Sequence, residues 1–170
     1  MINITSIENT LYEWADSVST HEIIFAYPNA PKPEPPYIMI NVLSNISQGG
    51  LNRNETLLTD DSIDVDYSEL EQVLISINVF GEGSYGEATK LKNSLDRVTV
   101  YEELFSNGLG LKSAKQIRKI PDLIDKKFEE RAQFDVEFFV RTLDEEHIET
   151  IQKVEITNEL SDETVIIEKP

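Results

Sequence analysis

Five prolines stand between residues 28 and 36, directly before a strand-like segment. Each proline fixes φ at about −65° and removes a backbone N–H, and it biases the preceding residue toward extended geometry. A helix is excluded here, so we expect a stiff arm close to polyproline II. In residues 37–43 the β-branched residues fall on every second position, which predicts a strand. The prolines are Pro28, Pro31, Pro33, Pro35 and Pro36.

Two stretches show the three- and four-residue spacing of apolar residues that is typical of helices. The two stripes are Ile4, Ile7, Leu11, Trp14, Ala15 and Val18 in the first, and Ala88, Leu91, Leu95 and Val98 in the second. A further helical turn or two is expected at residues 101–105, ended by Asn107 and Gly108. The sequence therefore predicts two main helices.

Strands are expected at residues 22–26, 71–80 and 132–140, where apolar residues alternate or form a short run. The alternation in 71–80 is half polar, which favours a sheet with one covered face. Residues 151–157 and 164–168 flank a polar turn and predict a terminal hairpin. Residues 122–131 suit either a short helix or an exposed edge, and the sequence leaves both open.

Together these elements predict a single α+β domain over residues 1–170. We expect a small mixed, mostly antiparallel sheet packed by two main helices, with a C-terminal hairpin and a long polar loop. The loop is residues 45–70, expected to be flexible and best described as an antiparallel hairpin with a disordered tip.

The chain has no cysteine, so disulfides, thiol nucleophiles and cysteine-based zinc sites are excluded. No apolar run approaches the ~18 residues of a membrane helix, and the first residues lack the pattern of a signal peptide. We therefore expect a soluble protein, made in a cytoplasm, with no membrane partner.

Charge is the most unusual bulk property: the formal net charge is −17, from 32 acidic and 15 basic residues. Residues 1–70 hold 11 acids and 2 bases, residues 71–131 hold 10 of each, and residues 132–170 hold 11 and 3. Affinity for nucleic acid comes largely from Lys and Arg at phosphates. Binding to a DNA duplex is therefore disfavoured.

Residues Gly81–Gly86 match the dinucleotide-binding pattern GxGxxG, between a predicted strand and a predicted helix. The half-polar strand and the missing acid at the end of a second strand argue against that use. Glu82 and Glu87 would also place negative charge beside a pyrophosphate. An ordinary glycine turn is the favoured interpretation, and a small nucleotide-binding α/β enzyme is the alternative.

Other candidate sites have simple interpretations. The acidic run from Asp60 to Glu69 lacks the ligand spacing of an EF-hand, which favours a solvated loop. His21 and His147 lack paired metal-ligand spacing, and no nucleophile motif is found. We therefore predict no catalytic residue, no cofactor and no metal.

The proline arm contains two P-x-x-P spacings, which would suit an SH3-like groove and an adaptor role. Proline provides stiffness more often than recognition. The favoured interpretation is an internal connector that docks on its own domain or on a neighbouring subunit.

Three stretches together resemble the neck or tail-terminator proteins of contractile-tailed bacteriophages and related prophages. They are LYEWA at residues 11–15, PYIMINVLS at residues 36–44 and FEERAQFDVEF at residues 128–138. A strand that ends in VFG at residues 79–81, before a helix, lies between them. The resemblance spans nearly the whole chain in order, although residues 45–70 give no match.

The resemblance implies an α+β domain that serves assembly and not catalysis. Six copies would form a ring at the head-proximal end of the tail, where the ring caps the tail tube and sheath and joins the head connector. Genome DNA would pass through a negatively charged bore without specific binding. The protein would be part of the virion neck, after assembly in the host cytoplasm.

In such a ring the charge-balanced segment 71–131 is the natural zone of subunit contact, because opposite charges there can pair across an interface. The predicted contact residues are Pro33, Pro36, Tyr37, Lys90, Arg97 and Arg131. Arg131 is expected to form a key salt bridge. The acidic segment 45–70 is expected to line the bore or to fold on a partner.

Overall fold

The computed structural model describes residues 3–26, 31–58, 62–124, 127–149, 153–158 and 163–168. The chain divides into two compact units: a first unit of residues 1–50 and 69–142, and a second unit of residues 51–68 and 143–170. Organisation as a single domain stays a prediction, which limited proteolysis would test.

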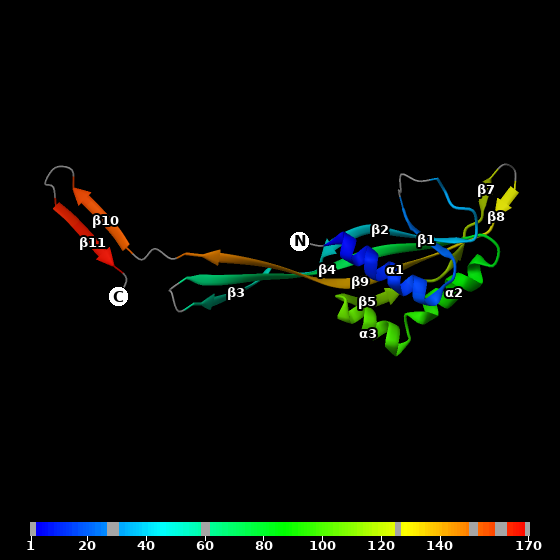
Figure 1. Ribbon diagram of the computed structural model, residues 1–170, viewed down its shortest axis with the longest axis horizontal. Helices are drawn as coiled ribbons and strands as arrows, with labels where there is room; N and C mark the ends of the chain where they lie inside the picture. Colours follow the sequence, from blue (N-terminus) through cyan, green and yellow to red (C-terminus); the bar gives the residue numbers. More distant parts are fainter. Residues whose placement is uncertain are drawn as a thin grey trace. The chain divides into compact units, whose positions relative to one another are not determined.

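Figure 1 shows the elements in chain order. The helices are α1 (Ile4–Val18), α2 (Ser84–Ser94) and α3 (Val98–Ser106). The strands are β1 (Glu22–Phe25), β2 (Tyr37–Ser47), β3 (Asn52–Leu57), β4 (Ile63–Phe80), β5 (Leu109–Ala114), β6 (Arg118–Lys119), β7 (Asp122–Ile124), β8 (Lys127–Glu129), β9 (Arg131–Ile148), β10 (Lys153–Asn158) and β11 (Glu163–Glu168). The predicted α+β class is confirmed.

The main sheet has the strand order β1-β2-β4-β9-β5, and it is mixed, as predicted. β1 runs parallel to β2, whereas β2 pairs antiparallel with β4, and β5 pairs antiparallel with β9. The short β6 also pairs with β9. β7 and β8 form a separate hairpin, so the choice that the sequence left open for residues 122–131 is decided in favour of strands.

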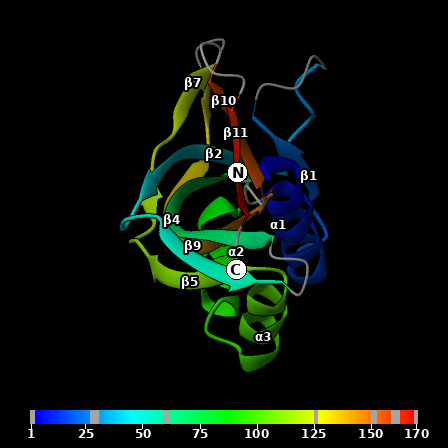
Figure 2. The ribbon, with the colours of Figure 1, turned by 90° about the vertical axis from the view of Figure 1, so that its left-hand side faces the viewer.

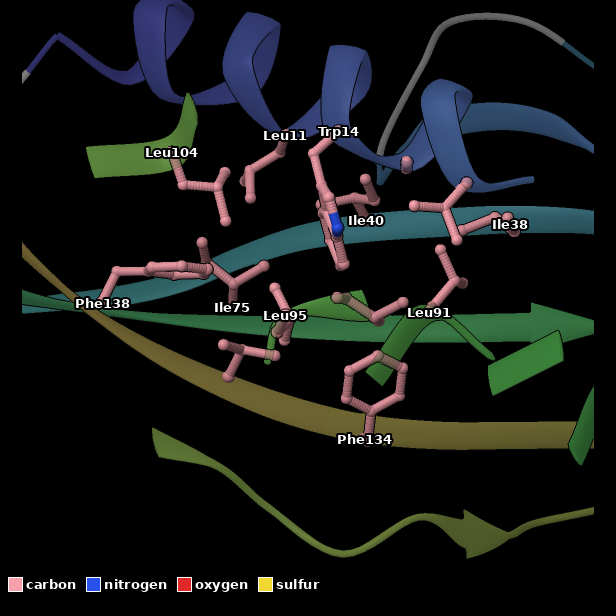
Figure 3. Close-up of a cluster of buried hydrophobic side chains, with 14 of the residues drawn as sticks. Leu11, Trp14, Ile38, Ile40, Ile75, Leu91, Leu95, Leu104, Phe134 and Phe138 are labelled. Carbon is pink, nitrogen blue, oxygen red and sulfur yellow. The ribbon is translucent and has the colours of Figure 1, made fainter. Parts of the chain in front are cut away.

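The hydrophobic core lies between the helices and one face of the sheet. Figure 3 shows Leu11 and Trp14 of α1 pointing toward the strands, with Phe134 of β9 on the opposite side of the cluster. The Asn3 side chain caps α1 by accepting the N–H of Ser6 at 3.1 Å. Every second residue of the predicted 71–80 strand faces this core, namely Val73, Ile75, Ile77 and Val79. The predicted stripe of the first helix is confirmed from Ile7 to Val18, whereas Ile4 is exposed, and the alternation of residues 73–79 is confirmed.

The second predicted helical stripe needs a correction. Ala88, Leu91 and Leu95 are buried, but α2 ends at Ser94, and Val98 begins the separate helix α3 with 70% of its surface exposed. The connecting turn has tighter hydrogen bonds, with the N–H of Leu95 donating to Lys92 O at 3.2 Å. This change of helical phase rotates Val98 off the buried stripe.

Residues 45–70 are mostly strand, so the prediction of a long loop is wrong, while the predicted hairpin is confirmed. In the second unit β3 pairs antiparallel with the first part of β4, from Asn52 opposite Ser68 to Leu57 opposite Ile63. All six residues of β3 are exposed. Their strand geometry is fixed by backbone pairing and not by an apolar face. Asp60 and Asp61 lie outside the described residues.

The predicted terminal hairpin is confirmed by the antiparallel pairing of β10 with β11, in which Val154 lies opposite Ile167. None of the helices in the described part of the chain has the length and apolarity needed to span a bilayer.

Candidate interface

The proline arm packs against its own unit at the turn that follows β4. Gly81 has a φ of +99°, and a Cβ at this position would lie 3.0 Å from Pro35 Cβ and 3.0 Å from Pro36 Cα. The glycine is therefore needed both for its backbone conformation and for the close approach of the arm. Tyr37, at the end of the arm, stacks on Phe80 with ring centroids 4.6 Å apart. This contact supports the interpretation of the arm as an internal connector.

Lys32, within the arm, contacts both of these aromatic rings and a carboxylate of β8. Its Nζ lies 5.6 Å from the ring centroid of Tyr37 and 5.4 Å from that of Phe80, and it donates a hydrogen bond to Glu129 Oε2 at 3.0 Å. Burial is the largest single influence and would lower the pKa of Lys32, but the hydrogen bond to Glu129 acts together with the interactions with Tyr37 and the charge of Glu129, and their sum raises the pKa. A charged ammonium over two aromatic faces is a cation–π contact as well as an ion pair.

The Gly81–Gly86 turn is occupied by a carboxylate of its own chain. Gly81 N–H donates to the backbone oxygen of Glu130 at 2.8 Å, and Gly83 N–H donates to Glu130 Oε2 at 3.0 Å. These are N–H groups that a bound phosphate would require. The adjacent pocket, lined by Ser84, Lys119, Pro121, Glu130 and Arg131, measures about 110 Å³. Sites for small-molecule ligands typically measure roughly 300–1,000 Å³, so the geometry favours an ordinary turn.

Arg131 is the centre of a polar network on the sheet face opposite the helices. Its Nη2 donates to Asn78 Oδ1 at 2.8 Å, its Nη1 lies 3.2 Å from Asp122 Oδ1, and the guanidinium lies 5.0 Å from the Phe80 ring centroid. Gln133 continues the network and donates to Ser76 Oγ at 2.7 Å. Ser76 and Asn78 are buried as a result, although the sequence predicts only one covered face for this strand.

The structure brings together some of the predicted contact residues. Tyr37 and Arg131 both contact Phe80. Tyr37 is buried, and burial raises its pKa. Arg131 forms its salt bridge within its own chain. A role of either residue at a subunit interface stays a prediction.

The remaining predicted contact residues are spread over three places. Pro33 is half-buried and Pro36 is exposed in the arm. Lys90 lies on α2 and pairs with Glu87 at 3.5 Å. Arg97 is exposed at the start of α3. Their contact role also stays a prediction.

Two features of the surface around α3 and β5 were not predicted from the sequence. The first is the exposed trio of Val98, Tyr101 and Phe105 on α3. Their spacing of three and four residues is visible in the sequence but is hidden when Val98 is assigned to α2. The second is a run of bases: residues 104–121 hold four Lys or Arg residues and no acid.

The second unit holds most of the net negative charge. Residues 51–68 and 143–170 together contain 14 acids and 3 bases, a net charge of −11, whereas the 124 residues of the first unit contain 18 and 12. Within the second unit Tyr67 Oη donates to Glu146 Oε2 at 2.9 Å, and this hydrogen bond raises the pKa of Tyr67. Among the described residues no cluster of three or more His, Asp or Glu gathers in a way that would hold a metal ion.

Comparison with known proteins identifies the family. The sequence pattern of the phage neck terminator protein family matches residues 5–162, which is most of the chain. No match was found among curated proteins. The matched range includes the arm, the polar network and most of each unit, and the family is one of structural phage proteins. The chain therefore belongs to the phage neck terminator protein family.

Proposed function

We propose that this protein forms a hexameric ring at the head-proximal end of a phage tail. The ring caps the tail tube and sheath, stops their growth and joins the tail to the head connector. The observation that carries the proposal is the family match over residues 5–162. Its partners are then further copies of itself, the tube and sheath proteins and the connector proteins of the neck, after assembly in the host cytoplasm.

The surface of the first unit supports a role in assembly. Large apolar side chains are exposed on α3 and in the β7–β8 hairpin, where Leu123 lies opposite Phe128 and both are mostly exposed. Exposed apolar patches of this kind mark sites of contact with other proteins. Catalysis has less support, because the glycine turn is occupied by Glu130 and the arm packs on its own unit.

The charge supports passage of DNA through the ring. A net charge of −17 repels a duplex and leaves few cations for its phosphates. A bore lined by acidic side chains would let DNA move without being bound. The expected result is no retention of a linear duplex by the purified protein at physiological ionic strength.

The experiment that tests this function is tube capping. Tail-tube protein of the same phage is polymerised with and without the purified protein, and tube lengths are measured by negative-stain microscopy. Capping predicts shorter tubes with the added protein at one end, at roughly one ring per tube. Tubes of unchanged length with no density at either end would contradict the proposal.

A further inference from the structure

The exposed face of α3 is an unpartnered apolar surface. Val98, Tyr101 and Phe105 expose 70%, 45% and 63% of their surface, and the two rings are stacked with centroids 6.1 Å apart. Phe105 reaches the neighbouring strand, because its Cδ2 would lie 4.0 Å from a Cβ placed on Gly110. Figure 2 shows α3 beside β5. A stacked aromatic pair in water gains much from a partner that covers it.

Basic side chains lie along the strand next to α3 and along the short strand that follows it. β5 ends the strand order of the described sheet, and Lys112, Lys115, Arg118 and Lys119 follow one another along β5, β6 and the segment between them. Glu137 lies 3.3 Å from Lys115, and Asp135 lies 2.6 Å from Arg118. Along these strands two carboxylates of β9 face four cations, a surplus of about +2, while α3 itself adds the exposed Glu102 and Glu103. We call these four residues with Val98, Tyr101 and Phe105 the basic edge.

The second unit has the complementary character. Its strand segments β3, 63–68 and 143–148 contain six carboxylates and one arginine, and they also expose Leu57 and Leu143. His147 Nδ1 lies 2.7 Å from Asp64 Oδ1, so β9 and β4 are neighbours here. Because alternate residues of a strand share a face, Asp66 and Glu145 lie on the same face as that pair. We call these three strand segments the acidic sheet.

We propose that the basic edge of one copy binds the acidic sheet of a neighbouring copy. Opposite charges then meet around an apolar centre made by the α3 trio and the exposed leucines, which is the usual anatomy of an interface. A chain with a net charge of −17 repels its copies wherever acidic surfaces meet, so this pairing of opposite charges also favours one orientation.

The two surfaces differ, so the contact is head-to-tail. Head-to-tail contacts close into a ring when the rotation between copies allows it, and otherwise they continue as a filament. The inference rests on the proposed function, because the contact between basic edge and acidic sheet is the one from which the proposed ring is built. Assembly is expected to weaken as salt is raised, because the charges are exposed.

Three charge-reversed variants test the contact. Lys115→Glu/Arg118→Glu reverses the basic edge, Asp66→Lys/Glu145→Lys reverses the acidic sheet, and a fourfold variant carries both changes. Asp66 and Glu145 form no ion pair in the described structure. The assay is the mass by light scattering at low salt, and a thermal melt of each variant checks that it is folded.

Each double variant is expected to lose assembly and to run near the 19.4 kDa of one chain. The double variants move the net charge in opposite directions, so a shared loss is not an effect of total charge. Mixing them one to one restores both kinds of contact in an alternating ring, and the fourfold variant restores them in a single chain. Both are expected to recover the wild-type mass.

Several results overturn the proposal. One is a folded double variant that assembles like the wild type, and another is a loss that neither the mixture nor the fourfold variant repairs. Recovery by the fourfold variant without recovery by the mixture would place the contact within one chain. A wild type that stays monomeric at low salt also overturns it. Tube capping is scored separately, so a wrong interface is distinguishable from a wrong function.

Discussion

The substitution Gly81→Ala tests how tightly the proline arm is held against the turn. The new Cβ would lie 3.0 Å from Pro35 Cβ and 3.0 Å from Pro36 Cα, and the backbone would keep a φ of +99°. The unfavourable φ costs about 1–3 kcal/mol, and overpacking costs about 1–3 kcal/mol more. Lower entropy of the unfolded chain returns about 0.4–1 kcal/mol. We expect the free energy of unfolding to fall by about 2–5 kcal/mol.

Two neighbouring glycines are matched controls. Gly83 has a φ of +78° and open space around its Cβ position, so Gly83→Ala carries the conformational cost alone, about 1 kcal/mol after the unfolded-state gain. Gly86 lies in α2 with ordinary φ and open space, so Gly86→Ala is expected to stabilise the protein by about 0.5–1 kcal/mol.

The assay is urea denaturation followed by the fluorescence of Trp14, the one tryptophan of the chain. The expected order of stability is Gly86→Ala above wild type, then Gly83→Ala, then Gly81→Ala. An equal loss of unfolding free energy in the Gly81 and Gly83 variants would refute the reasoning. It would show that the new Cβ at position 81 adds no steric cost against the arm.

Three further predictions concern the core, the polar network and the basic edge. Trp14→Phe removes the indole N–H that donates to Ser94 Oγ at 3.0 Å, so the free energy of unfolding should fall by about 2 kcal/mol, measured by circular dichroism in urea. Arg131→Met removes the donor of the buried Asn78 and should cost about 2 kcal/mol in the same measurement, whereas a change within error would show that the network is dispensable. The pKa of Glu137 is lowered, first by a hydrogen bond from Ser113, so its contribution to stability is present above pH 4.5, the usual value, and is lost as the pH falls through the folded-state pKa. Glu137→Gln should therefore flatten the acid side of the stability–pH profile. An unchanged slope would count against a stabilising hydrogen bond between Ser113 and the Glu137 carboxylate.

Much of the first unit could be predicted from the sequence, because its helices and strands each bury one face. The apolar residues of that face recur in the sequence at the spacing of a helix or a strand. The helix from Ile4 to Val18 and the strand that ends at Phe80 both show this period. β3 could not be predicted in this way, because all of its residues are exposed and no periodic pattern accompanies its pairing with β4.

The interface could be predicted only in part, because side chains far apart in the sequence decide which cations are free. Arg131 is predicted from the sequence to form a salt bridge in the zone of subunit contact, yet Asn78 and Asp122 of its own chain bind it in the folded structure. The four bases of the basic edge are visible as a run without acids. It becomes clear only from the strand register that these four bases face just two carboxylates, Asp135 and Glu137.

The mass and shape of the purified wild-type protein test the central claim most directly, which is that this chain works by assembling with its own copies. Six chains of 19.4 kDa give a particle of about 116 kDa. The account predicts this mass by light scattering, and closed rings in negative-stain class averages. A 19.4 kDa monomer that binds a nucleotide at the Gly81–Gly86 turn would contradict it.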